Sequence, residues 1–201
     1  MTAQTQILAK LKAASAQGRQ STKPYRPEFS GGLWEGFAAH AKASDAKIHE
    51  IASALDIPEK LQSLFAGNGG ITPLHIAQGS HLRDLPWSRA PHLAMHDTPP
   101  GGEAIALSAA DFAIAETGTL VFCSGAARPS SWHFLPGIEC VLLRRPLILP
   151  TLEDVFAQMA DAAMPATLNL VTGPSRTADI EQTIERGAHG PRALHIFLTT
   201  D

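Results

Sequence analysis

Cysteine is scarce in this sequence, with only Cys123 and Cys140 among 201 residues. A disulfide scaffold is not expected in a chain of this size that shows no secretion signal. An iron–sulfur cluster usually needs four thiolates, so this chain alone cannot supply a typical one. Both cysteines lie in apolar runs, where buried and unreactive thiols are usual. We therefore expect this chain to hold no cofactor of its own.

Long apolar runs and an excess of basic residues are also missing. No stretch approaches the roughly 18 consecutive apolar residues that a membrane span needs. The formal net charge is -3, and there is no basic stripe of the kind that binds nucleic acid. Residues 1–17 lack the continuous apolar core and basic start of a secretion signal. These absences predict a cytoplasmic protein that neither spans a membrane nor binds nucleic acid.

The histidines show no metal-binding pattern, and no G-x-G-x-x-G fingerprint for a dinucleotide is present. His92 and His96 are four apart but flank a predicted strand, where such side chains lie roughly 13 Å from each other. His75, His81 and His133 are isolated in the sequence. We predict no metal site.

The first third of the chain has a helical pattern. Apolar residues recur at helical spacing over residues 7–14, which predicts a short amphipathic helix. Residues 18–34 combine Gly, Pro, Ser and charges and predict an extended connection. Residues 35–55 predict one long helix or two abutting ones, and a further helix is predicted over residues 58–65, with Pro58 in its first turn. We assign residues 1–67 to an N-terminal helical segment that packs on the core.

From residue 68 the apolar runs become short and are bounded by Gly, Pro or polar residues. Several are apolar at consecutive positions, as expected for strands that are covered on both faces. The runs are residues 74–77, 92–95, 113–115, 120–123, 140–143, 168–171 and 194–198. A helix-like stretch, 152–163, lies between two of them. The pattern predicts an α/β core over residues 68–201 with a mostly parallel sheet, in one structural domain with the N-terminal segment.

Polar side chains are concentrated between two of these runs, in Glu116-Thr117-Gly118-Thr119. The chain is expected to turn at Gly118. Glu116 could then act as a general base, as a nucleophile or as the hydrogen-bond partner of a substrate hydroxyl. The alternative is a plain turn, in which Thr117 and Thr119 bond to backbone amides and Glu116 faces solvent.

A second polar segment follows the predicted strand that ends near residue 171. Its ligand-binding candidates are Gly173, Pro174, Ser175, Arg176, Thr177 and Asp179. Gly173-Pro174 predicts a turn, and Thr177 or Asp179 could cap a short helix that Gly187 ends. Free amides at a helix start attract anions, and the Arg176 guanidinium suits a carboxylate or phosphate. The alternative is a capped helix with a surface arginine.

A third segment, Gly187 to Arg192, precedes the last predicted strand. Glycines on both sides of His189 allow close backbone approach, and Gly190-Pro191 indicates a turn. His189 could be an acid–base group or could orient a ligand, the alternative being a structural histidine in a turn. Gly190 and Arg192 complete the ligand-binding candidates, with Arg192 as a second clamp for an anion.

Three blocks of the sequence, taken together, resemble the LUD-domain family, which is also described as the YkgG-like family. The blocks are ETGTLVFCSG, RPSSWHFLPG and NLVTGPSRTADIEQTIERGAHGPRALHIFL. The resemblance runs from about Leu107 to the C-terminus. GPSRTADIE followed by HGPR is its most specific part.

The resemblance implies a Rossmann-like sheet similar to that of the sugar-phosphate isomerase and CoA-transferase (NagB/RpiA-like) superfamily. It also implies a bacterial role in oxidising lactate to pyruvate, together with two iron–sulfur partner proteins. The resemblance assigns the family's functional segments to residues 116–119, 173–181 and 189–192 of this sequence. Where family members often have a histidine after the Leu-Pro pair, this chain has Glu139. If that position touches ligand, the departure implies a different mode of binding.

The leading hypothesis is a lactate-utilization subunit that binds a small 2-hydroxy or 2-oxo acid. Arg176 or Arg192 would pair with the carboxylate, and Glu116 or His189 would handle the hydroxyl proton. Oxidation would need a cofactor or partner, so it is open whether this chain is itself an enzyme. The first alternative is a non-catalytic assembly or regulatory module of the same system. The second, which rests on fold analogy alone, is an isomerase- or transferase-like enzyme for a phosphorylated or CoA-linked substrate.

Overall fold

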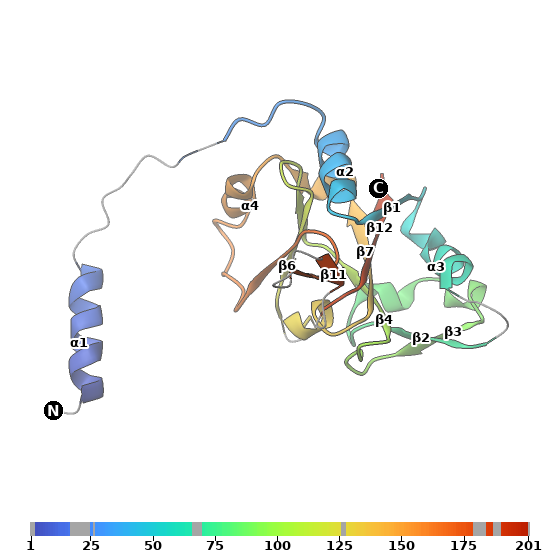
Figure 1. The fold of residues 1–201 in the computed structure, drawn as a ribbon, viewed down its shortest axis with the longest axis horizontal. Coiled ribbons are helices and arrows are strands. Elements are labelled where there is room, and N and C mark those ends of the chain that lie inside the picture. Colours follow the sequence, from blue (N-terminus) through green and yellow to red (C-terminus); the bar gives the residue numbers. More distant parts are fainter. Residues whose placement is uncertain are drawn as a thin grey trace.

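The computed structural model describes residues 3–16, 25, 27–65, 70–125, 128–178, 184–186 and 190–200. Its α-helices are α1 (Ala3–Ala16), α2 (Leu33–Ala43), α3 (Ile57–Phe65) and α4 (Leu152–Gln158). Its longer strands are β1 (Lys47–Glu50), β2 (Thr72–His75), β3 (Leu93–His96), β4 (Ile105–Ala109), β6 (Thr119–Cys123), β7 (Ile138–Arg144), β9 (Leu168–Val171) and β12 (Ala193–Thr199). The shorter strands are β5 (Phe112–Ile114), β8 (Ile148–Leu149), β10 (Arg176–Ala178) and β11 (Ile184–Arg186). Figure 1 shows their arrangement.

The main sheet has six strands in the order β1-β12-β7-β4-β2-β3, and all of its neighbouring strands are parallel. This confirms the α/β fold with a mostly parallel sheet. The consecutive apolar positions of β7 explain its place at the centre: Val141 and Leu143 enter the core on one face, and Cys140 and Leu142 enter it on the other. Successive side chains of a strand point to opposite faces, so a strand covered on both sides is apolar throughout.

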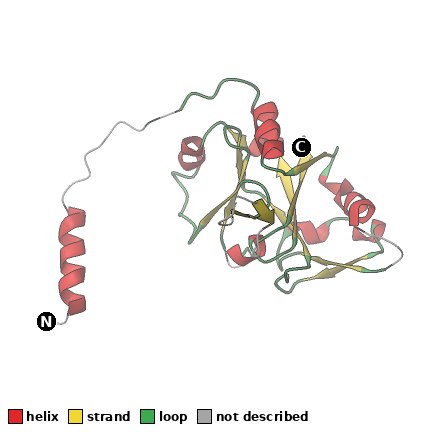
Figure 2. Ribbon diagram, viewed as in Figure 1, coloured by secondary structure: helices red, strands yellow, loops and turns green. Residues whose placement is uncertain are grey.

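A second sheet, in the order β8-β5-β6-β9, covers one face of the main sheet together with α2. Leu120 and Phe122 of this sheet share a buried cluster with Phe37 of α2 and Val141 of β7. The opposite face is covered by α3, as Figures 1 and 2 show. The buried cluster between the two sheets is therefore formed mainly by side chains from β5, β6, β7, β12 and α2.

The predicted helix over residues 35–55 is correct only in its first part. α2 ends at Ala43, Asp45 adopts a left-handed backbone conformation with φ 70°, and the chain then forms strand β1. Aspartate tolerates this conformation better than most residues, so it can stop a helix abruptly. β1 pairs with β12, placing Ile48 opposite Ile196. The pairing with a buried strand overrides the helical spacing of residues 47–50.

The predicted helix after Arg176 is wrong for the residues that can be described. Residues 176–178 form β10, which pairs antiparallel with β11, so that Thr177 lies opposite Glu185. Residues 179–183 lie outside the described residues. The segment is rich in β-branched threonine and isoleucine, whose stiff side chains favour strands over helices. Residues 176–178 and 184–186 therefore provide no helix N-terminus for an anion.

The other predicted helices are present. The helix predicted over residues 58–65 is α3, and α4 begins after Thr151, whose side chain caps it, but ends at Gln158, short of the predicted residue 163. α1 forms where the amphipathic helix is predicted, and its Ile7, Leu8 and Leu11 are at least half exposed. None of the described helices combines the length and the apolar character required to cross a membrane.

A histidine pair between β1 and β12, of which His195 is buried and His49 half-buried, makes the stability of the fold depend on pH. The Nδ1 atom of His195 lies 3.0 Å from the Nε2 atom of His49, and Phe65 meets the His195 ring at an edge. Burial, followed by the charges of His49 and Lys47, lowers the pKa of His195 to about 4. The fold therefore favours neutral His195, whereas the unfolded chain takes up the proton near pH 6.5.

Stability from His195 is present above about pH 6.5 and is lost as the pH falls toward about 4. We expect the thermal midpoint of the wild-type protein to fall more steeply than that of His195→Gln between pH 7.5 and pH 4.5. Differential scanning calorimetry at both pH values measures this difference. Equal falls in the two proteins would show that His195 is not the titrating group.

Candidate small-ligand site

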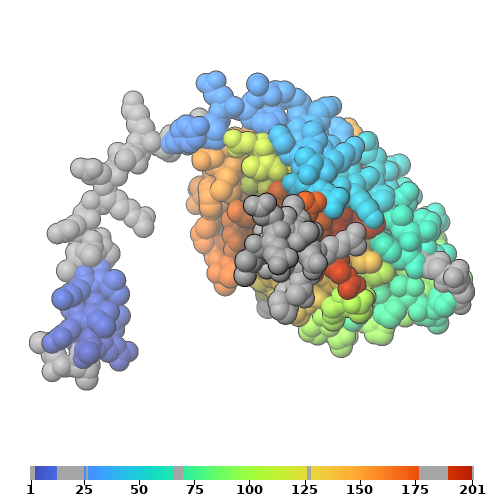
Figure 3. All heavy atoms as spheres, in the orientation of Figure 1, coloured from blue at the N-terminus to red at the C-terminus, as the bar shows by residue number. Residues whose placement is uncertain are grey.

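The two glycine turns that the sequence predicts both lie in close contact with the backbone at the C-terminal end of α2. Gly118 has φ 66°, and a Cβ atom there would lie 2.2 Å from the backbone nitrogen of Ala41. Gly173 has φ 80°, and its Cβ atom would lie 2.1 Å from the backbone oxygen of Ser44. Figure 3 shows α2 (light blue) at the surface, next to segments from much later in the sequence. Glycine is required at both positions for its backbone conformation and for the close approach.

Three threonine hydroxyls connect these two turns. The Oγ1 atoms of Thr117 and Thr119 are 2.7 Å apart, and that of Thr119 is 2.6 Å from the Oγ1 atom of Thr172. The antiparallel pairing of β6 with β9 brings them together, because it places Leu120 opposite Val171. The predicted polar segments are thus adjacent. The Glu116 residue is exposed, as in the plain-turn alternative, and its role stays a prediction.

Much of the second polar segment lines an open pocket of about 420 Å³. Its walls are formed by residues 170–176, together with His133, Phe134, Gly190 and Pro191. The backbone N–H of Ser175 donates to the Pro191 carbonyl at 2.8 Å, which joins the segments that precede β10 and β12. The structure therefore brings five predicted ligand residues to one pocket: Gly173, Pro174, Ser175, Arg176 and Gly190. Glu116 and Arg192 do not line it.

The two arginines predicted as anion clamps have different surroundings. Arg176 lines the pocket and forms an exposed ion pair with Asp45 at 3.1 Å. Arg192 donates from both terminal nitrogens to the Glu103 carboxylate, at 2.7 and 2.6 Å. These hydrogen bonds lower the pKa of Glu103. Arg176 is thus the arginine placed to meet a ligand in this pocket.

Three predicted site residues cannot be placed. Asp179 and His189 lie outside the described residues. Thr177 belongs to β10, but its side chain is also outside the description. Their proposed roles stay predictions.

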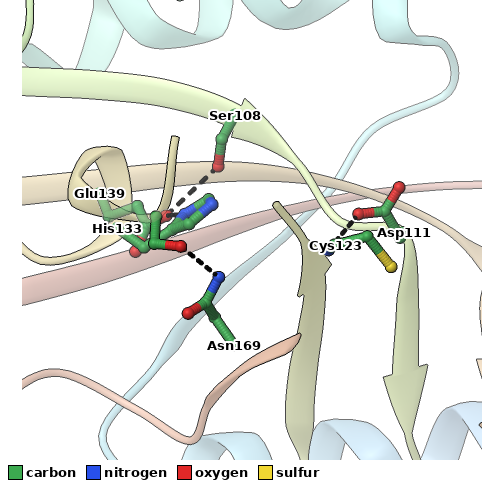
Figure 4. Close-up of polar contacts among 7 residues, drawn as sticks. Ser108, Asp111, Cys123, His133, Glu139 and Asn169 are labelled. Atoms are coloured by element: carbon green, nitrogen blue, oxygen red, sulfur yellow. Dashed lines mark hydrogen bonds and ion pairs between the residues drawn. The ribbon is translucent and has the colours of Figure 1, made fainter. Parts of the chain in front are cut away.

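A buried histidine–carboxylate pair is the feature that the sequence reasoning missed. The Nδ1 atom of His133, in the single helical turn Ser130–His133, lies 2.6 Å from the Oε1 atom of Glu139 on β7. The Ser108 hydroxyl on β4 donates to the same oxygen at 3.3 Å, as Figure 4 shows. The His133 ring stacks on Phe122 with centroids 3.9 Å apart. The pair is therefore held by the main sheet on one side and by β6 on the other.

The Glu139 carboxylate has an unusual environment. Glu139 is fully buried, and its Oε2 atom has no hydrogen-bond partner among the described residues. Burial raises the pKa of Glu139, while the hydrogen bond and charge of His133 act in the opposite direction. A buried carboxylate with one unsatisfied oxygen destabilises a fold, so a functional role is a reasonable explanation.

Two sequence signals could have identified this pair. Glu139 interrupts an otherwise apolar strand, which indicates a buried charge that needs a partner. His133 lies only six residues earlier, across the turn at Leu135-Pro136-Gly137. The alternation of β7 then places Glu139 on the face of Val141, which looks toward the second sheet.

A smaller cavity of about 180 Å³ lies between the sheets, and His133 lines both this cavity and the larger pocket. Its walls are largely apolar, with Leu107, Phe122 and Trp132 among them. Its polar groups include Ser108 and the ion pair between Asp111 and Arg128. A mostly apolar cavity with a few convergent polar groups is typical of a small-molecule site.

The two cysteines differ in their burial. Cys140 is fully buried as predicted, whereas Cys123 is half-buried and lines the smaller cavity. Burial raises the pKa of both thiols, which keeps them protonated at neutral pH. Within the described ranges, no group of three or more His, Cys, Asp or Glu side chains is arranged to hold a metal ion. The predicted absence of a metal site stays a prediction.

Comparison with known proteins concerns the part of the chain that lines the larger pocket and most of the smaller cavity. The family model of the LUD domain matches residues 104–199, which confirms that this segment resembles the LUD-domain family. Lactate utilization protein C of Halalkalibacterium halodurans is 32% identical over 100 residues, which are 47% of this chain and 44% of that protein. Protein YkgG of Escherichia coli is 37% identical over 95 residues, 44% of this chain and 41% of YkgG. The chain therefore spans less than half the length of these relatives.

A solved structure supports the fold. The crystal structure of a DUF162 family protein from Deinococcus radiodurans superposes with a TM-score of 0.61 and covers 83% of this chain and 96% of that one. The two sequences are 18% identical, so the likeness concerns the fold alone. The finer similarity to the NagB/RpiA-like superfamily stays a prediction.

Proposed function

From its LUD domain, we propose that this protein acts in lactate utilization and binds a small 2-hydroxy or 2-oxo acid. The relatives named lactate utilization protein C support the role, and the LUD-domain model matches the residues that line the larger pocket. The observation that carries the proposal for the ligand is the convergence of residues 173–176 and 190–191 on that pocket.

The pocket has the chemistry that a small carboxylate requires. The Arg176 guanidinium at its edge offers several N–H donors to a planar carboxylate. Gly173 and Gly190, both with positive φ, bring the backbone close to the pocket without intervening side chains. Leu170, Val171 and Phe134 provide an apolar wall for the remainder of the ligand.

The redox centres belong, in this proposal, to iron–sulfur partner proteins in the cytoplasm. Two cysteines are too few for a typical four-thiolate cluster. Co-purification of this chain with two iron–sulfur proteins from lactate-grown cells tests the partnership. If the complex forms and growth on lactate is unaffected by variants of the pocket, the chain is an assembly module and not a ligand-binding subunit.

Arg176→Ala is expected to weaken the binding of lactate or pyruvate by about 10- to 100-fold, because a hydrogen-bonded charge pair contributes roughly 1.5–3 kcal/mol. Isothermal titration calorimetry of the full chain, alone and with its partners, measures the affinity. Arg89→Ala is a matched control, since Arg89 is similarly exposed and also faces a carboxylate, that of Glu59. Absence of binding to the wild-type protein under both conditions would refute the proposed ligand.

A further inference from the structure

The side chain of His133 lies at the wall shared by the two cavities, and Glu139 and Ser108 hold its ring from the main sheet. We propose that His133 is the residue that exchanges a proton with the bound acid, and that Glu139 is the positioning residue that orients its ring. This inference rests on the proposed function. It assigns the proton to a residue other than Glu116 or His189, the candidates that the sequence indicates.

The hydrogen bond to Glu139 selects one tautomer of neutral His133. When the Nδ1–H group donates to an ionised Glu139, the Nε2 atom has no proton and can accept one. Stacking on Phe122 limits rotation of the ring. A histidine with a carboxylate behind one nitrogen and a cavity beside it is the arrangement that a general acid–base group needs.

The negative charge of the Glu139–His133 pair couples the binding of a carboxylate ligand to the uptake of a proton by the pair. With Glu139 ionised and His133 neutral, the buried pair carries one negative charge, and a ligand carboxylate nearby is repelled. Uptake of one proton by the pair neutralises it and removes the repulsion. The other titratable groups that line the two cavities are His81, Asp111, Cys123, Arg128 and Arg176. Asp111 is already paired with Arg128, and Arg176 with Asp45, so the unsatisfied Glu139 oxygen marks this pair as the group that responds.

The smaller cavity has the size of the proposed ligand. A dry cavity of roughly 150 Å³ accommodates benzene, which has six non-hydrogen atoms. Lactate and pyruvate also have six non-hydrogen atoms. The volume of this cavity is about 180 Å³, which is enough for either molecule. His133 lines both this cavity and the larger pocket that Arg176 lines, so a ligand in either space is next to the His133 side chain. Glu116 lines neither cavity and is exposed.

The test is the pH dependence of pyruvate binding between pH 6 and pH 8, measured by calorimetry on the full chain in buffers of different ionisation enthalpy. For the wild-type protein we expect affinity to fall as the pH rises, by up to roughly tenfold per unit, with a matching net uptake of protons. His133→Gln should lose the proton uptake. Glu139→Gln should also lose it, because a glutamine amide that donates to Nδ1 leaves the proton on Nε2. His92→Gln is the control, since His92 is exposed and lines neither cavity.

The outcomes separate this inference from the proposed function. Wild-type binding with the same proton uptake in His133→Gln overturns the inference and leaves the proposed function intact. Failure of the wild-type protein to bind pyruvate or lactate refutes both. Loss of proton uptake in both variants, with uptake unchanged in His92→Gln, supports the inference. Circular dichroism of each variant at both ends of the pH range establishes that it is folded.

Discussion

His133→Ala is expected to lower the free energy of unfolding by about 3–5 kcal/mol at pH 8, because it removes the closest hydrogen-bond donor of a buried carboxylate and leaves only the Ser108 hydroxyl, at 3.3 Å. Glu139 is fully buried, and its Oε2 atom already has no partner among the described residues. The variant also loses the stacking of the His133 ring on Phe122. Urea denaturation followed by circular dichroism measures the change.

The loss should be smaller at acidic pH, which identifies Glu139 as its cause. A carboxyl whose pKa is raised in the folded state contributes stability that is present at low pH and is lost as the pH rises through the folded pKa. Lowering the pH favours protonated Glu139 in the variant and so removes the buried charge. The double variant His133→Leu/Glu139→Leu should recover most of the stability, since apolar replacement of a buried pair is often neutral or stabilising. An equal loss at pH 5 and pH 8 would show that packing, not the charge, is responsible.

Gly118→Ala is expected to lower the free energy of unfolding by about 2–5 kcal/mol, from roughly 1–2 for the left-handed backbone and roughly 1–3 for overpacking. The new Cβ atom would meet the backbone of α2 at Ala41, which cannot move away as a flexible side chain could. Gly173→Ala should have a similar effect through its contact with Ser44. Thermal denaturation of both variants measures the change.

Two other glycines are controls for this prediction. Gly101→Ala should change the midpoint little, because a Cβ atom there has nothing within 4 Å and the backbone is not left-handed. At Gly31 the backbone has φ 123° but the Cβ position is open, so Gly31→Ala isolates the cost of the conformation. If Gly118→Ala destabilises the protein no more than Gly31→Ala, the contact with α2 is not important.

The sequence predicted the local structure correctly where the residues of a single segment are enough to determine it. Consecutive apolar residues in segments such as 140–143 predicted strands covered on both faces, and the parallel sheet confirmed this. Gly118 and Gly173 predicted turns, because few other residues adopt a left-handed backbone. The same reasoning failed at residues 47–50, where pairing with β12 replaced a helical pattern by a strand. It failed again after Arg176, where the described residues form a hairpin.

The candidate site also combines features that the local sequence predicts with features that depend on the packing of distant segments. The sequence alone predicted the resemblance to the LUD-domain family, the mostly parallel sheet and the polar segment whose residues 173–176 line the larger pocket. The packing of the fold, and not the sequence pattern, shows that Arg192 pairs with Glu103, that both glycine turns contact the end of α2, and that His133 pairs with Glu139. The physical reason is that these partners come from separate elements. A residue pattern records local spacing and polarity, whereas a buried charge finds its partner through the packing of one sheet against another.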